Sequence, residues 1–178
     1  MTTLLQLYYW QVNVPLSQRT KIFSCVPSDL RRYLEFKYKK RLQWPFCLPS
    51  GDTPFSNASD YKILWNDWPY GIDKEITHLV VWTKFSMDSA ADEISPSIHA
   101  AIESFVVHAF CDAKCGGLAR SKVIWFKNWM SLKSVGEIEH FHVMLYRADK
   151  DFIKRITCGE RPLAEKAQEA GASILDLV

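Results

Sequence analysis

Two histidines stand one residue apart in the apolar stretch "IEHFHVMLY", at positions His140 and His142. Because side chains alternate between the two faces of a β-strand, both imidazoles are expected on one face, together with Met144 and Tyr146. A histidine side chain can accept or donate a proton near neutral pH. The spacing therefore predicts two acid–base groups side by side on one strand.

Two further groups are expensive to bury without a purpose. His78 opens the strand-like segment "THLVVWTKF", and Lys127 lies inside "VIWFKNWMSL". If the three segments are neighbouring strands, about 4.8 Å apart, these groups line one cavity with aromatic walls. Two alternatives stay open: hydrogen-bonded structural histidines, or a metal site made by His78, His140 and His142. A two-histidine phosphoesterase is excluded, since Val80 and His142 stand where a Thr or Ser is needed.

A second polar concentration surrounds the turn sequence "WPYG" at 68–71. Asp67 and Asp73 flank this turn. Carboxylates beside aromatic faces suit a bound cation such as a guanidinium group. The alternative is ordinary turn chemistry, in which Asp serves the backbone.

The chain has a formal net charge of only +2, but one segment is strongly basic. Residues 28–42 are predicted to form a helix whose leucines share one side. Its cations point to contact with the phosphates of a nucleic acid, the alternative being a solvated helix surface. They are Arg31, Arg32, Lys37, Lys39, Lys40 and Arg41.

Periodicity defines the other elements. The segment 95–117 predicts a helix that starts at a Ser–Pro cap and stops at two glycines, with His99 and Glu103 as a surface pair. Residues 43–62 are expected to form a long loop, and the chain after Arg147 is expected to be helical. Residues 1–178 are therefore predicted to form a single α+β domain, a mainly antiparallel sheet covered by helices.

Composition limits the class of protein. Hydrophobic residues make up 48% of the 178 residues, which favours a folded domain. No apolar run reaches the roughly 20 residues of a membrane span, and no signal pattern opens the chain, so a cytoplasmic protein is expected. Five cysteines at irregular spacing are expected to be free thiols, with Cys111 and Cys115 as a weaker metal alternative.

Three motifs in order carry a family resemblance: "LWNDWPYGIDKEITHLVVWTKF", "VIWFKNWMSLKSV" and "IEHFHVMLY". Together they span about 61–146 and resemble the fungal N-acetylglucosamine-induced protein family, a domain of unknown function. One branch of that family is induced by amino sugar. Another comprises arginine-containing cyclodipeptide synthases, which take arginyl-tRNA and a second aminoacyl-tRNA and close a diketopiperazine without a cofactor.

The synthase resemblance implies roles for the residues above. His140 and His142 would act as acid and base, supported by His78 and Lys127, and the basic helix would hold the tRNAs. Substrate would be held by Asp67, Trp68, Tyr70, Asp73, Trp82, Trp125 and Trp129. The alternatives are a non-catalytic, N-acetylglucosamine-responsive protein that binds a small ligand, and a metal-dependent hydrolase.

Overall fold

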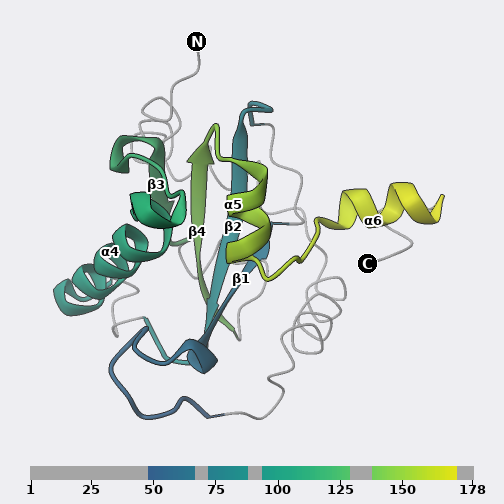
Figure 1. Cartoon of the computed structure of the whole chain (residues 1–178). Coiled ribbons are helices and arrows are strands. Elements are labelled where there is room, and N and C mark those ends of the chain that lie inside the picture. Colours follow the sequence, from purple (N-terminus) through teal and green to yellow (C-terminus); the bar gives the residue numbers. More distant parts are fainter. Residues whose placement is uncertain (1–47, 67–71, 88–93, 129–137, 172–178) are drawn as a thin grey trace, which may run out of the picture.

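The computed structural model describes residues 48–66, 72–87, 94–128 and 138–171. Their centre is a four-stranded antiparallel sheet with strand order β1-β2-β4-β3 (Figure 1). The strands are β1 (Tyr61–Trp65), β2 (Ile76–Thr83), β3 (Val123–Phe126) and β4 (Glu139–Tyr146). The predicted α+β class and the antiparallel pairing of β3 with β4 are confirmed.

The described helices are α4 (Pro96–Cys111), α5 (Lys150–Ile156) and α6 (Leu163–Ala170). Short 3-10 turns are η1 (Ala58–Asp60), η2 (Ala113–Cys115) and η3 (Arg120–Lys122). In Figure 1, α6 extends beyond the sheet, whereas α5 crosses in front of it. Within the described segments, none of these helices has the length and apolar character needed to cross a membrane.

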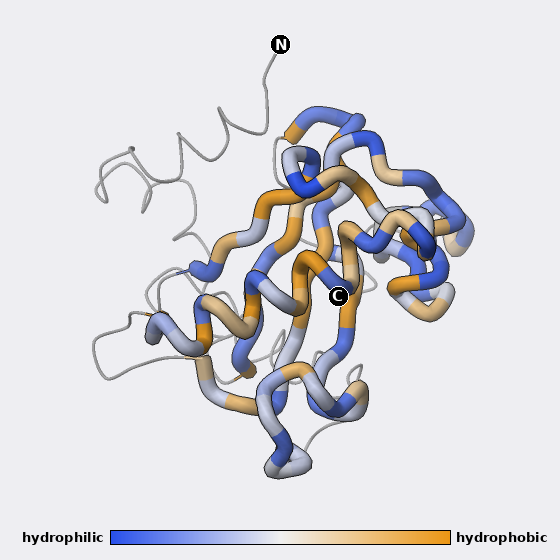
Figure 2. The backbone as a smooth tube through the Cα atoms, turned by 60° about the vertical axis from the view of Figure 1, so that its left-hand side comes forward, coloured by the Kyte–Doolittle hydropathy of each residue, from blue (hydrophilic) through white to orange (hydrophobic). Residues whose placement is uncertain are grey.

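One face of the sheet packs against α4 and α5 to form the main core. Strands β2 and β4 are buried along nearly their whole length. Figure 2 shows hydrophobic and hydrophilic positions interspersed along the described backbone. The core residues contributed by the two helices are Ile102, Phe105, Val106, Phe110, Phe152 and Ile153. Central strands are typically buried on both faces, so the position of β2 inside the sheet explains why its sequence is apolar on both faces.

The N-terminus of α4 follows the prediction, but its C-terminus does not. The Ser95 hydroxyl accepts a hydrogen bond from the Ile98 backbone N–H at 3.3 Å, with Pro96 in the first position. The helix ends at Cys111, several residues before the glycines. A Cβ at Gly117 would lie 2.6 Å from the backbone nitrogen of Asp112. The turn is therefore so tight that this position accepts only glycine.

The early helix end separates Cys111 from Cys115, because the helical i, i+4 geometry expected for a metal pair is broken. Among the described cysteines, these two and Cys158 are free thiols, as expected.

The first strand was not foreseen from the sequence. The region 43–62 is predicted to be loop, yet β1 begins at Tyr61 and pairs along its full length with β2. Glu160 protects the outer edge of β1: its carboxylate accepts the Trp65 backbone N–H at 3.3 Å, and its carbonyl accepts the Trp65 indole N–H at 2.9 Å. This contact joins the segment before α6 to the sheet.

Candidate functional site

The face of the sheet opposite α4 and α5 carries three buried histidines. Register places Trp82 opposite His140 and Phe126 opposite His142, and directly paired residues share a face. His78 lies on the same face, four residues before Trp82 on β2. The predictions that His140 and His142 share a face, and that the three segments are adjacent strands, are confirmed. We call this surface the histidine face.

Four side chains form a continuous hydrogen-bonded row on the histidine face, here called the histidine chain: Asn66, His78, His142 and Asn128. The side-chain amide nitrogen of Asn66 lies 3.1 Å from His78 Nδ1. His78 Nε2 lies 3.0 Å from His142 Nδ1. His142 Nε2 lies 3.1 Å from the amide nitrogen of Asn128. All four ring nitrogens of the two histidines are thereby engaged, from the end of β1 to the residues after β3.

Both rings of the histidine chain are neutral at pH 7. Their residues are 6% and 5% exposed, respectively. Burial lowers the pKa of His78 to about 3. Burial also holds the pKa of His142 well below its ordinary range, and charge on His78 or His140 would lower it further. Phe126 shields the row by stacking on His142, with ring centres 4.9 Å apart.

His140 has a fixed tautomer in its neutral form. Its Nδ1 lies 2.8 Å from the carbonyl oxygen of Ile138. A carbonyl oxygen only accepts, so Nδ1 carries the hydrogen and Nε2 carries the lone pair. The ring packs on Trp82 at 4.6 Å and meets His142 edge-on at 5.6 Å. In its neutral form, His140 therefore carries its lone pair on Nε2, beside the histidine chain.

Two predicted site residues do not join the histidines as expected. Trp125 is paired with Val143, on the core face of the sheet. Lys127 follows the end of β3 and is half-buried, and the side chain that reaches His142 from this segment is Asn128. The prediction of Trp125 on the histidine face is wrong, because register brings Phe126 rather than Trp125 opposite His142.

Asp73 has the geometry of a turn residue. Its carboxylate accepts the Glu75 backbone N–H at 2.9 Å. The Glu75 carboxylate in turn accepts hydrogen bonds from Nε and Nη2 of Arg147, at 2.6 and 3.0 Å. It also accepts one from the Tyr146 hydroxyl at 3.1 Å. The guanidinium site therefore stays a prediction. Several of its residues, and all of the basic helix, lie outside the described residues: Asp67, Trp68, Tyr70, Trp129 and 31–41.

Nothing in the described segments brings three His, Cys, Asp or Glu side chains to metal-ligand positions. His78, His140 and His142 are all described, and their arrangement does not form such a group. The physical reason is that two of the rings hydrogen-bond to each other, while His140 Nδ1 is committed to a backbone carbonyl.

Comparison with known proteins decides the family. A sequence profile for the family described as "Protein of unknown function (DUF3605)" matches residues 14–146, about three quarters of the chain. The chain belongs to this family. The match contains β1 to β4, so the histidine chain lies within the part of the molecule that defines the DUF3605 family.

Two curated relatives extend this result. N-acetylglucosamine-induced protein 1 of Candida albicans is 33% identical over 112 residues, which are 61% of this chain and 43% of that protein. The uncharacterized protein YPL067C of Saccharomyces cerevisiae is 28% identical over 120 residues, 66% of this chain and 60% of that protein. The matches thus span less than two thirds of either relative's length. The crystal structure of HTC1 has a TM-score of 0.48, with 22% identity and 80% coverage of each chain.

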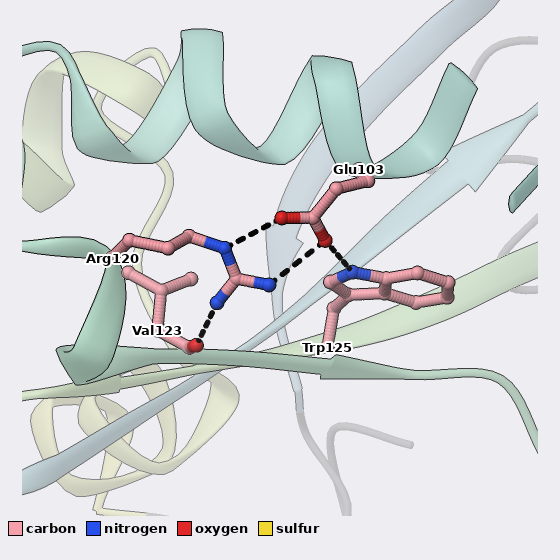
Figure 3. Close-up of polar contacts among 4 residues, drawn as sticks. All are labelled: Glu103, Arg120, Val123 and Trp125. Carbon is pink, nitrogen blue, oxygen red and sulfur yellow. Dashed lines mark hydrogen bonds and ion pairs between the residues drawn. The ribbon is translucent and has the colours of Figure 1, made fainter. Parts of the chain in front are cut away.

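An ion-pair cluster on the other side of this DUF3605 domain was also missed from the sequence (Figure 3). Arg120 donates from Nε and Nη2 to the two carboxylate oxygens of Glu103, at 2.7 and 2.8 Å, and from Nη1 to the Val123 carbonyl at 2.6 Å. The Trp125 indole N–H donates to the same carboxylate at 2.8 Å. Glu103 is therefore bonded to Arg120 of η3 and to Trp125 of β3. It also interacts electrostatically with His99, its predicted partner, whose ring lies 4.9 Å from Trp125.

Glu103 is expected to make stability depend on acid pH. Hydrogen bonds from Arg120 are the main cause that lowers the Glu103 pKa from 4.5 to about 2. This stabilisation is fully present above pH 4.5 and is lost as the pH falls toward 2. Since the Glu103 side chain is 36% exposed, solvent screening limits the loss in Glu103→Gln to about 1 kcal/mol.

Urea unfolding of Glu103→Gln at pH 7 and pH 3 measures this effect, with exposed Glu165→Gln on α6 as the matched control. The difference from wild type should be larger at pH 7. Equal differences at both pH values would contradict the assigned ion pair.

Proposed function

We propose that this protein is a cofactor-free aminoacyl-tRNA-dependent transferase, a cyclodipeptide synthase that joins arginine from arginyl-tRNA with a second amino acid. The observation that carries the proposal is His140. The hydrogen bond between its Nδ1 and the Ile138 carbonyl leaves the lone pair of the neutral ring on Nε2. The residue is buried beside His142, a second neutral imidazole. The resemblance of the three strand motifs to the arginine-containing cyclodipeptide synthases supports the same choice.

Diketopiperazine formation requires two acyl transfers. In each, an α-amine attacks an ester carbonyl carbon, the C–N bond forms, the bond to the ribose oxygen breaks, and one proton passes from the amine to that oxygen. A neutral imidazole with a defined lone pair can take the proton from the amine and return it to the leaving oxygen. His140 is assigned this exchange. His142 is held neutral beside it and is assigned the second acid–base role.

Aromatic residues on the histidine face protect the aminoacyl esters from water. Trp82 is 3% exposed and its ring covers His140, while Phe126 covers His142. Exclusion of water favours attack by an amine over hydrolysis. The arginyl side chain is assigned to the Asp67 and Asp73 turn, on the sequence argument. The site of action is the cytoplasm, where charged tRNAs occur.

Mass spectrometry of the reaction products tests the proposal directly. Purified protein is mixed with arginyl-tRNA and a pool of the other charged tRNAs. A new arginine-containing cyclic dipeptide is expected. No such product should form when the tRNA has been digested with ribonuclease before mixing. Absence of any such product across the whole pool would overturn the synthase assignment.

Salt dependence tests the tRNA contact of the basic helix. Neutralising two phosphate contacts in a Lys39→Gln, Lys40→Gln variant is expected to lower the slope of log affinity against log salt by about 2. The control is Lys150→Gln, Lys154→Gln, which removes equal charge from α5. A slope that falls equally in both variants would show that no specific helix contact exists.

A second candidate function has its own supporting observation. The three histidines are only 3–6% exposed, and the pKa of His78 is about 3, which suits a role in holding the sheet together. The protein would then be a non-catalytic, N-acetylglucosamine-responsive protein that binds a small ligand, in keeping with the name of the Candida relative. Calorimetric titration with N-acetylglucosamine, combined with a negative product assay, would favour this candidate.

A further inference from the structure

The histidine chain is constrained by the number of protons that two neutral imidazoles carry. Each ring has one N–H and one lone pair, and an asparagine side chain ends in an NH₂ donor and an oxygen acceptor. Three contacts of 3.1, 3.0 and 3.1 Å connect the four groups. Every contact needs one donor and one acceptor, so the direction of one hydrogen bond fixes the next.

Two inward-donating amides are incompatible with this count. If both donated, His78 Nδ1 and His142 Nε2 would both be acceptors. The hydrogens would then lie on His78 Nε2 and His142 Nδ1, which face each other at 3.0 Å. Because the oxygen and nitrogen of an amide occupy nearly equivalent positions, one amide satisfies the row by presenting its oxygen.

Only two arrangements satisfy all three contacts. In the first, Asn66 donates to His78 Nδ1, His78 Nε2–H donates to His142 Nδ1, and His142 Nε2–H donates to the Asn128 oxygen. In the second, every bond is reversed, and both rings carry their hydrogen on Nδ1. The two imidazoles therefore have the same tautomer in both arrangements.

We propose that Asn66 and Asn128 are positioning residues that set the tautomers of His78 and His142 together, so that the histidine chain is a single two-state unit for proton transfer. In the first arrangement, a proton from water enters at His78 Nδ1 when the Asn66 amide turns away, and the His78 Nε2 proton passes to His142 Nδ1. The Nε2 proton of His142 returns to water as Asn128 turns its NH₂ group toward the ring. One proton enters and one leaves, and both amides turn.

Burial lowers the pKa of both rings, which keeps each imidazole neutral at pH 7 with a single N–H, as the count above requires. The use of this transfer in catalysis rests on the proposed function. The shared tautomer of His78 and His142 does not rest on the proposed function, because it follows from the three contacts of the histidine chain.

Nitrogen-15 NMR of histidine-labelled protein distinguishes protonated from unprotonated ring nitrogens. In wild type, His78 and His142 are expected to show one shared tautomer, or to exchange between the two together. His140 is the internal reference and should carry its hydrogen on Nδ1 throughout. Different tautomers in the two rings of the wild type would overturn the proposal without any variant.

Two substitutions of nearly unchanged shape test the control by the amides. Asn128→Asp supplies only acceptors, so both rings should adopt Nε2–H. Asn66→Asp should force both rings to Nδ1–H. The decisive reading is the distant ring: His78 in Asn128→Asp, and His142 in Asn66→Asp.

A variant that changes only the adjacent ring, or that protonates this ring at both nitrogens, would overturn the proposal. The spectra need no turnover, so a negative product assay with the expected tautomers would reject the synthase function and leave this inference intact. In an active enzyme, either variant is expected to lower kcat with little change in KM.

Discussion

Replacement of His142 by alanine is expected to reduce cyclic dipeptide formation by at least about 10²-fold, the lower range for loss of an acid–base group. The substitution removes a ring that contacts His78, His140 and Asn128. It also leaves His78 Nε2 and the Asn128 amide without this partner inside the sheet. Catalysis and local structure are therefore both affected, and the measurement must separate them.

The stability cost of His142→Ala is expected to be about 2–4 kcal/mol, from the cavity and from the polar groups that lose their partner. Initial rates are therefore compared at low temperature, after circular dichroism has shown that the variant is folded. The matched control is His108→Ala, an exposed histidine on α4. Unchanged turnover in folded His142→Ala would assign His142 to structure alone.

The helices and central strands of this fold were predictable because their patterns are periodic and strong. The α4 cap, the apolar run of β2 and the alternation of β4 all gave correct elements. β1 was missed because its five residues follow a loop rich in Pro, Ser and Asp, and a strand this short has little periodicity. The pairing of β1 with β2 is a tertiary contact, which the local sequence pattern does not reveal.

The site was predictable in part. Alternation correctly placed His140 and His142 on one face. Alternation also correctly placed Lys127 and Asn128 on opposite faces of their segment. The sequence does not say which of the two faces lies beside the histidines. The pairing of Phe126 with His142 decides this, and a shift of one residue would have exchanged the two side chains.

Asn66 and Glu103 were missed for a related reason. Neither Asn66 nor its partner His78 belongs to a motif with fixed spacing, and 12 residues separate them along the chain. Glu103 and Arg120 are 17 residues apart, and only the packing of α4 against β3 makes them neighbours. Sequence gives local spacing, whereas these contacts depend on how elements dock.

Replacement of Phe55 is expected to lower the stability of the protein markedly. The Phe55 ring stacks on Phe105 at 4.4 Å, meets Phe85 edge-on at 4.9 Å and lies 6.0 Å from Phe141. It belongs to the loop before β1, whose ends are joined by Ser50: the Ser50 hydroxyl donates to the Asp60 carboxylate at 2.5 Å. Loss of the ring in Phe55→Ala should therefore cost about 2 kcal/mol, less than for a fully buried phenylalanine because this ring is only partly buried.

The backbone at Phe55 makes this expectation more specific. Its φ is 67°, in the left-handed region, which costs a residue with a side chain roughly 1–2 kcal/mol. Phe55→Gly loses the same ring contacts but relieves this strain, so it should be up to about 1 kcal/mol more stable than Phe55→Ala, after allowing for the flexibility of glycine in the unfolded chain. At an ordinary loop position the order would be the reverse.

Urea unfolding of the two variants measures this difference, and Leu48→Ala, at a residue 85% exposed in the same loop, should change stability by less than about 0.5 kcal/mol. A cost below about 1 kcal/mol for Phe55→Ala would mean that the loop does not contribute to the core. If the alanine variant were more stable than the glycine variant, the left-handed conformation would not persist in solution. The expected order would instead show that a strained aromatic residue anchors this loop to the core face, on the side of the sheet opposite the histidine chain.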